Sequence, residues 1–189
     1  RRNPILFPAP GHTERDPQAM WRDVGEALQE LLQGLAVSAD DIAAVSVSGY
    51  GAGLYLVDAQ GQAVRPGIMS TDNRAAEVLA HWARDGLSER NGLRIQQRLW
   101  AWQPAGLLAW LAQHEPAVVD ATHTLMFCKD YLRAQFCGDL STDITDAGLG
   151  GLVDVTRNTF SGAFYDELGL AVWQDKLPSI GGSAEVVGE

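Results

Sequence analysis

The chain has 189 residues, a length that suits one domain, or one domain with a short appendage. With histidine neutral, 24 acidic and 14 basic side chains give a net charge of −10. This charge repels phosphate backbones and anionic lipid, so we expect neither nucleic acid nor membrane as a partner. Hydrophobic residues make up 46% of the chain and charged residues 20%, which predicts a folded rather than a disordered protein. No apolar run approaches the ~20 residues that cross a bilayer.

The two cysteines, Cys128 and Cys137, do not have the spacing of a CxxC motif. Their separation would permit pairing, but two such thiols are more typical of a reducing compartment than of a disulfide framework. The N-terminal residues contain no apolar stretch like that of a signal peptide. We therefore predict free, partly buried thiols and a cytoplasmic location. The absence of an initiator methionine is typical of a piece of a longer protein.

The first third of the chain predicts a helix followed by strands. Asp16 and Pro17 are a typical helix start, with aspartate as the cap and proline in the first turn. Residues 42–48 are expected to form a buried strand, because they are apolar and contain β-branched valines. Residues 54–57 and 62–69 flank a short turn that contains glycine, which predicts a hairpin. The apolar residues with helical spacing in the first helix are Met20, Trp21, Val24, Leu28, Leu31, Leu32 and Leu35.

Helices and short strands alternate in the rest of the chain. Asp72 is expected to cap the first of these helices. The alternation, interrupted by the hairpin, predicts an α/β fold with a mixed sheet. The expected elements are a helix over 74–84, short helix and loop over 86–103, a helix from Pro104 that breaks at 114–116, a strand over 125–127, and a helix over 129–136 that Gly138 ends.

A glycine-rich turn separates the first two expected strands. It consists of Gly49, Tyr50, Gly51, Ala52 and Gly53. Glycines between strands permit close approach of the backbone to a ligand, and the alternative interpretation is a β-bulge without a ligand. A strand rather than a helix follows, so this is not the dinucleotide-binding GxGxxG motif, and the chain has no phosphate-binding GxxxxGK[ST] loop.

Polar side chains gather at the next junction between a strand and a helix. Ser70, Asp72 and Arg74 place a hydroxyl, a carboxylate and a guanidinium within five residues. Such a junction can hydrogen-bond a polyhydroxy ligand. The alternative is that Asp72 and Arg74 pair locally beneath a capped helix.

Further candidates carry weaker signals. Trp102 lies in irregular chain, where its ring could line a sugar pocket or merely pack, while Trp110 is expected in the core. Lys129 beside Asp130 is expected to be a solvated pair. Asp143 is expected to cap or pin a loop. None of the four histidines has a cysteine or histidine partner at ligand spacing, so no metal site is predicted.

Four stretches resemble, in this order, the FGGY carbohydrate kinase family: GHTERDPQAMW, VSVSGYGAGLYLVDAQGQAVRPGIMSTDNRA, CKDYLRAQFCGDLSTDITDA and LPSIGGSAEVVGE. The resemblance covers nearly the whole chain and depends on order and spacing rather than on one motif. The stretches GAGLYLVDAQG, STDNRAAE and LPSIGGSAEVVGE are most similar to the branch of L-xylulose, xylulose and erythritol-type polyol kinases.

The resemblance implies an actin-like (ribonuclease H-like) α/β domain, with a mixed sheet and flanking helices, that is incomplete at its N-terminus. Residues 1–176 would form the N-terminal, sugar-binding domain without the family's opening Asp-x-Gly-Thr hairpin. Residues 177–189 would be a linker toward a second domain. In the family two domains flank a cleft, so ATP and Mg²⁺ would be bound mainly by parts outside this chain. No catalytic residue is expected within the chain, because the family's aspartate base would lie C-terminal to Glu189.

The resemblance also implies site residues. The family's sugar-contacting turn falls on Tyr50, Gly51 and Ala52, where xylulose kinases carry Gln-Met-His and glycerol kinases carry Gln-Arg-Glu. A family tryptophan is replaced by Ser70, which counts against glycerol as the substrate. The implied substrate-binding residues are Tyr50, Gly51, Ala52, Ser70, Asp72, Arg74 and Trp102.

The implied function is transfer of the γ-phosphoryl group of ATP to a hydroxyl of a ketopentose (L-xylulose or xylulose type) or polyol. The chain alone would be inactive, because the base and the phosphate loop lie outside it. The alternatives are a non-catalytic module of the same fold that binds a sugar or a protein, and a scaffold without a sugar site. The resemblance leaves a homodimer open.

Overall fold

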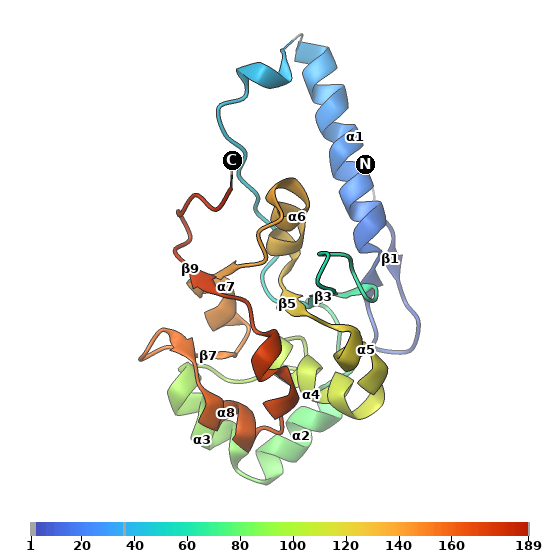
Figure 1. Cartoon of the computed structure of the whole chain (residues 1–189). Coiled ribbons are helices and arrows are strands. Elements are labelled where there is room, and N and C mark those ends of the chain that lie inside the picture. Colours follow the sequence, from blue (N-terminus) through green and yellow to red (C-terminus); the bar gives the residue numbers. More distant parts are fainter. Residues whose placement is uncertain (1–2, 36, 189) are drawn as a thin grey trace.

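The computed structural model describes residues 3–35 and 37–188, and Figure 1 shows their elements in chain order. The helices are α1 (Pro17–Leu35), α2 (Ala76–Arg84), α3 (Leu87–Ile95), α4 (Pro104–His114), α5 (Pro116–Ala121), α6 (Cys128–Cys137), α7 (Ile144–Leu149) and α8 (Gly162–Glu167), with 3-10 helices η1 (Ala39–Asp41) and η2 (Ala171–Lys176). The strands are β1 (Ile5–Leu6), β2 (Glu14–Arg15), β3 (Tyr55–Val57), β4 (Gly67–Ile68), β5 (Thr124–Met126), β6 (Thr142–Asp143), β7 (Val153–Asp154), β8 (Thr159–Phe160) and β9 (Ile180–Gly181).

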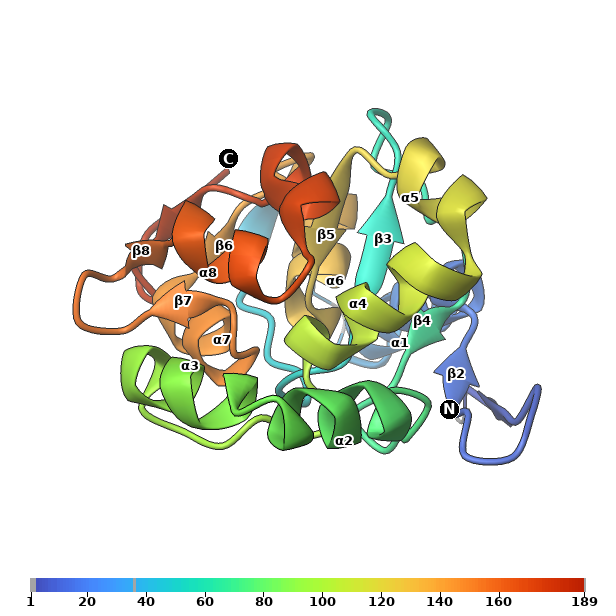
Figure 2. The ribbon, with the colours of Figure 1, turned by 90° about the horizontal axis from the view of Figure 1, so that it is seen from below.

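Short strands pair in both directions. Strands β1, β2 and β4 form an antiparallel sheet in that order, and β3 pairs antiparallel with β5, with Tyr55 opposite Met126. Strand β6 pairs parallel with β9, and β7 forms a hairpin with β8. Figure 2 shows β3 beside β5, with α2 and α3 along one side of the body. The mixture of parallel and antiparallel pairs with flanking helices confirms the predicted α/β class.

Two hydrophobic clusters hold the body together. The larger one joins β3 and β5 to α2, α4, α8 and η2, and Trp173 is fully buried in it. The indole Nε1 of Trp173 donates a hydrogen bond to the carbonyl of Leu108 (3.1 Å), so its single polar atom is satisfied. Each fully buried leucine, isoleucine or phenylalanine side chain in this cluster contributes roughly 1.5–3 kcal/mol to stability. The smaller cluster consists of Met20, Tyr55, Val57, Met126, Cys128, Tyr131 and Ala134.

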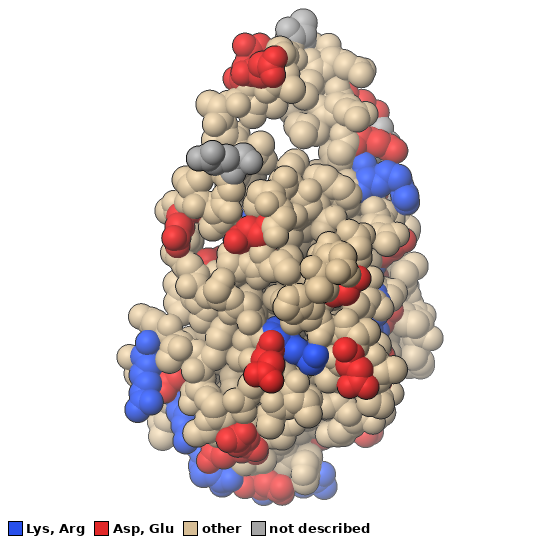
Figure 3. Space-filling view, viewed as in Figure 1, with Lys and Arg blue, Asp and Glu red and all other residues tan. Residues whose placement is uncertain are grey.

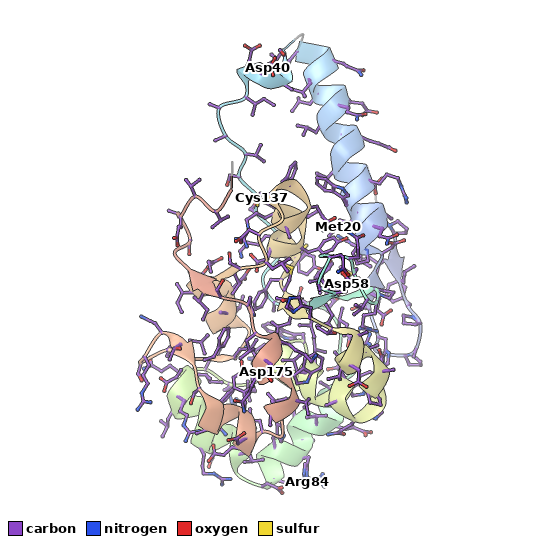
Figure 4. The ribbon with its side chains drawn as sticks, viewed as in Figure 1. Met20, Asp40, Asp58, Arg84, Cys137 and Asp175 are labelled. Carbon is purple, nitrogen blue, oxygen red and sulfur yellow. The ribbon has the colours of Figure 1, made fainter. Side chains whose placement is uncertain are left out.

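Helix α1 forms as predicted, but its apolar face is only partly covered, and Leu31 and Leu35 toward its C-terminal end are exposed. The carboxylate of Asp16 accepts hydrogen bonds from the backbone N–H groups of Gln18 (2.9 Å) and Ala19 (3.0 Å), which confirms the predicted cap. Met20, labelled at the base of the helix in Figure 4, is buried, whereas Leu35 near the other end is 62% exposed. Figure 1 shows the helix extending away from the body.

The prediction of a buried strand over residues 42–48 is wrong for this structure. The segment is irregular and mostly exposed, and Val45 is 57% exposed. Its sequence suits a strand, but a strand needs a hydrogen-bonded neighbour, and within the described residues none lies beside it. In the space-filling view of Figure 3 an opening separates α1 from the chain that returns from η1.

The predicted hairpin is present, but its second strand is shorter than predicted. Strand β4 covers only part of 62–69, and single bridges join Leu54 to Ile68 and Val57 to Ala63. Asp72 does not cap the following helix, because α2 begins after Ala75 and has no side-chain cap. The aspartate instead accepts a hydrogen bond from the backbone N–H of Thr13 (2.6 Å).

The other predicted helices are present with small shifts. Helix α3 accounts for the helical part of 86–103, α4 begins at Pro104, and α6 ends at Gly138. The break at 114–116 is confirmed, but the short helix α5 that follows it was missed. Both thiols are free as predicted. In the described part of the chain, no helix combines the length and the apolar character that crossing a bilayer needs.

The segment predicted as a linker, residues 177–189, contains a short strand. This strand, β9, pairs with β6, so the segment is joined to the body rather than wholly irregular. The last residue of the segment, Glu189, lies outside the described residues. The catalytic base is expected outside this chain, C-terminal to Glu189, so its placement stays a prediction. The boundary between domain and linker also stays a prediction.

Gly138 gives a test of backbone strain alone. Its φ is +74°, and a Cβ at this position would meet no atom within 4 Å. We expect Gly138→Ala to lower the free energy of unfolding by about 1 kcal/mol, because only the left-handed backbone opposes a side chain. The matched control is Gly25→Ala inside α1, where space is also open, and it should raise stability by about 0.5–1 kcal/mol. Equal effects of the two variants in urea titrations would contradict this account.

Candidate functional site

The turn formed by residues 49–53 leads into β3 and has an unusual backbone. Ala52 has φ +58° although it is not glycine, and it is fully buried. Gly53 has φ +74°, and a Cβ there would lie 2.7 Å from the carbonyl oxygen of Ile68. Left-handed conformations of residues other than glycine are costly and cluster at functional sites. The glycine at 53 is therefore required by close approach, and the conformation at 52 marks the turn as a candidate site.

The hydroxyl group of Tyr50 points toward the smaller hydrophobic cluster and is held there by a hydrogen bond. It lies 2.8 Å from the hydroxyl group of Tyr55, which in turn donates to Met20 Sδ (3.8 Å). Desolvation by burial raises the pKa of Tyr50 above its usual range, with a further contribution from Cys128. The phenol therefore stays protonated at neutral pH, and its inward hydrogen bond fixes the start of the turn.

Ser70 lies against the same turn. A Cβ built at Gly53 would lie 3.4 Å from the backbone nitrogen of Ser70 and 3.1 Å from Cε2 of Tyr50. The structure thus brings Tyr50, Gly53 and Ser70 together, as the hairpin between β3 and β4 requires.

Asp72 and Arg74 take part in a buried ionic network. Nη2 of Arg74 lies 2.9 Å from Oδ2 of Asp72 and 2.7 Å from Oε1 of Glu14, and the arginine side chain is only 1% exposed. Burial alone would lower the pKa of Arg74, but its hydrogen bonds to Asp72 and Glu14 raise it. Arg65 also binds Glu14 (2.6 Å), and the ring of Trp110 lies 5.1 Å from the Arg74 guanidinium carbon. Local pairing, the alternative drawn from the sequence, is therefore the arrangement observed.

Trp102 is partly buried, and the residue after it was missed by sequence reasoning. The Gln103 side chain is buried, and its Oε1 accepts a hydrogen bond from the backbone N–H of Trp100 (2.7 Å). Its Nε2 donates to the carbonyl of Leu149 (2.7 Å) and to Oε1 of Gln97 (3.0 Å). Gln103 therefore joins the tryptophan-containing loop to the end of α7. The only sequence signal was a polar residue directly before a helix-starting proline.

The prediction that Lys129 forms a solvated pair with Asp130 is wrong. The Lys129 side chain is 21% exposed, and Nζ contacts three carboxylates: Asp130 (2.6 Å), Asp143 (2.6 Å) and Asp146 (3.0 Å). Asp143, which was expected to cap or pin a loop, instead caps helix α7, which the sequence did not predict: its carboxylate accepts a hydrogen bond from the backbone N–H of Thr145 (2.7 Å). We refer to Lys129, Asp130, Asp143 and Asp146 as the lysine cluster.

The pKa values in the lysine cluster diverge. Burial raises the pKa of Asp146. Burial acts in the same direction on Asp143, but hydrogen bonds from Lys129 and Thr145 prevail and hold its pKa well below its usual range. Burial would lower the pKa of Lys129, but hydrogen bonds to Asp130 and Asp143 raise it above its usual range. The ammonium group therefore stays charged at neutral pH and neutralises part of the carboxylate charge.

The lysine cluster lies directly behind the turn. A Cβ built at Gly49 would lie 3.2 Å from the backbone nitrogen of Lys129, and one at Gly51 would lie 3.7 Å from Oδ1 of Asp146. The described residues contain no arrangement of His, Cys, Asp and Glu suited to a metal ion. A surface cavity of about 350 Å³ lies elsewhere, and its lining of Gln60, Gln62 and Gln135, with neighbours, includes none of the predicted site residues.

Comparison with known proteins identifies the family. The model of the N-terminal domain of the FGGY family of carbohydrate kinases matches residues 1–189. The L-xylulose/3-keto-L-gulonate kinase of Escherichia coli (strain K12) is 32% identical over 184 residues, which are 97% of this chain and 37% of that protein. The xylulose kinase of the same organism is 26% identical over 97% of this chain and 37% of its own length. This chain therefore spans little more than a third of the length of these relatives.

Solved structures agree on the fold. The ligand-bound xylulose kinase from Lactobacillus acidophilus superposes with a TM-score of 0.85 and 22% identity, over 96% of this chain and 36% of that one. The gluconate kinase from the same organism gives the same values. The expected actin-like α/β fold is thus confirmed, as the fold that these two kinases have over the matched part. From the match along its whole length, the chain belongs to the FGGY family of carbohydrate kinases, as its N-terminal domain.

Proposed function

We propose that this chain is the sugar-binding part of an ATP-dependent kinase that phosphorylates a hydroxyl group of a ketopentose or polyol. The observation that carries the proposal is the match to relatives named L-xylulose and xylulose kinases over 97% of the chain. Two features of the structure support it: a turn of small residues in a strained backbone, and polar groups beside that turn. No observation favours the non-catalytic alternative.

The proposed roles differ among the predicted site residues. Gly51 offers a backbone edge to the sugar, and Ser70 offers a hydroxyl group. Ala52, which is fully buried, and Tyr50 fix the conformation of the turn, and Trp102 remains a proposed pocket wall. Asp72 and Arg74 are proposed to act by positioning, since their charged atoms are buried and already paired.

The proposed kinase needs ATP and Mg²⁺, and the described residues do not suit either. No phosphate-binding glycine loop precedes a helix, and the carboxylates of the lysine cluster surround an ammonium group rather than an open cation site. We propose that both bind mainly to polypeptide outside this chain, and that the catalytic base lies C-terminal to Glu189. There ATP and Mg²⁺ would supply the phosphoryl group and neutralise its charge, while this chain orients the acceptor hydroxyl and excludes water.

We also propose that the opening hairpin implied by the resemblance pairs with residues 42–48 and covers the exposed part of the apolar face of α1. The exposure of Val45 supports the pairing, because the segment is apolar and lacks a strand partner, and the exposure of Leu35 leaves apolar surface on α1 for the hairpin to cover. The location of the protein in the cytoplasm remains a proposal, with which the free thiols agree.

The test is an ATP-coupled assay of the full-length protein that contains this chain, with L-xylulose, D-xylulose, D-ribulose, erythritol and glycerol. We expect turnover of at least one ketopentose or polyol other than glycerol, and no turnover by the 189-residue chain alone. Failure of the full-length protein on the whole panel would refute the proposed function. Robust activity of the 189-residue chain alone would refute the proposal that the ATP site and the catalytic base lie outside it.

A further inference from the structure

Leu149, the last residue of α7, covers the glycine turn. A Cβ built at Gly51 would lie 2.5 Å from Cδ2 of Leu149 and 3.9 Å from its Cγ. A real Cβ does not approach another carbon so closely, so the space that a side chain at position 51 would need belongs to Leu149. Leu149 is nevertheless 40% exposed, so part of its side chain faces outward beside the turn.

The position of Leu149 is held by the surrounding backbone. Its carbonyl accepts a hydrogen bond from Nε2 of Gln103 (2.7 Å), and the carbonyl of Gly148 accepts one from Nε2 of Gln97 (2.6 Å). At the other end of α7 the carboxylate of Asp143 caps the helix. These hydrogen bonds fix the backbone at Leu149, so its exposed side chain offers an apolar surface at a defined place beside the turn.

A polar group lies on the same helix face. Asp146 precedes Leu149 by three residues, so the two side chains are neighbours on α7. Oδ2 of Asp146 contacts Lys129 (3.0 Å), whereas Oδ1 lies 3.7 Å from the Cβ built at Gly51. The face of α7 toward the turn thus presents a methyl group beside a carboxylate oxygen, the combination that suits a sugar with its apolar C–H face and hydroxyl groups.

We propose that Leu149 determines which sugar the turn accepts, by forming an apolar wall whose position depends on the absence of a side chain at Gly51. The inference rests on the proposed function and deepens it. A larger residue at position 51 would displace Leu149, so the two positions together set the room above the turn. A wall of this kind discriminates by shape, and one methylene group in such a wall changes specificity by about 10-fold or more.

The kinetic test uses the full-length kinase and the two sugars that it turns over best. Leu149→Ala should change the ratio of their kcat/KM values by about 10-fold, while the KM for ATP stays within about two-fold. Leu149→Met should keep the ratio close to that of the unmodified enzyme, because the wall remains. The matched control is Leu93→Ala on α3, an 81% exposed leucine, which should leave the ratio unchanged.

A second readout needs no catalysis. In the full-length protein, a nuclear Overhauser effect should connect a δ-methyl group of Leu149 with the Hα protons of Gly51. Its absence would overturn the inference, as would an active enzyme in which Leu149→Ala leaves the sugar ratio unchanged. An unmodified full-length protein that phosphorylates no sugar would instead refute the proposed function, while the Overhauser effect would still decide whether Leu149 covers the turn.

Discussion

Replacing Arg74 with methionine is expected to lower the free energy of unfolding by about 3–5 kcal/mol. Methionine fills similar volume, so the loss comes mainly from charge. The carboxylate of Asp72 is fully buried and would lose its cationic partner, while Glu14 would keep only Arg65. A buried charge without its partner costs far more than a surface pair contributes. Chemical denaturation followed by tryptophan fluorescence measures the change.

The control for this variant is Arg84→Met. Arg84 is exposed at the C-terminal end of α2, the helix that follows Arg74, where Figure 4 labels it, and its replacement should change stability by no more than about 0.5 kcal/mol. The double variant Arg74→Met with Asp72→Asn should recover part of the loss, because it removes the orphaned carboxylate. If Arg74→Met were as mild as Arg84→Met, the network would not stabilise the fold.

Replacing Lys129 with methionine should also cost about 3–5 kcal/mol at pH 7. The substitution leaves the carboxylates of Asp130, Asp143 and Asp146 close together without the ammonium group that now contacts all three. The matched control is Lys176→Met: Lys176 donates to the carbonyl of Thr122 (2.6 Å), so its loss should cost only about 1 kcal/mol. Similar losses for the two lysines would contradict a special role of the cluster.

The effect of Lys129→Met should depend on pH. The lowered pKa of Asp143 contributes stability above its unfolded pKa of about 3.9, and this contribution is lost as the pH falls through the folded value. The raised pKa of Lys129 contributes stability below about pH 10.4 that is lost only as the pH rises through its folded value. The unmodified protein therefore has both contributions at neutral pH.

In the variant the carboxylates repel one another, and protonation relieves the repulsion. The stability difference between Lys129→Met and the unmodified protein should therefore be largest near neutral pH and shrink as the pH falls toward 4. The Lys176→Met difference should stay nearly constant over the same range, since no carboxylate is involved. Urea titrations at several pH values distinguish the two patterns, and a pH-independent difference for Lys129→Met would disprove the electrostatic explanation.

The candidate site was predictable only in part. The turn at 49–53 and the junction at 70–74 stand out in the sequence because glycines and polar residues interrupt apolar strands. The sequence does not show that Arg74 reaches Glu14, sixty positions away, or that Leu149 covers Gly51. Such contacts depend on how distant segments pack, and no local pattern reports them.

Local signals were enough for the ends of several helices. The cap at Asp16, the start at Pro104 and the stop at Gly138 each act within about four residues, so the chain itself determined them. The order of short stretches also pointed to the kinase family. Only the tertiary structure shows that no strand within the described residues pairs with residues 42–48, and that a lysine and three aspartates from separate segments meet behind the turn. A strand and an ion cluster both need partners that are distant in sequence, and only the packing of the fold determines whether those partners lie close in space.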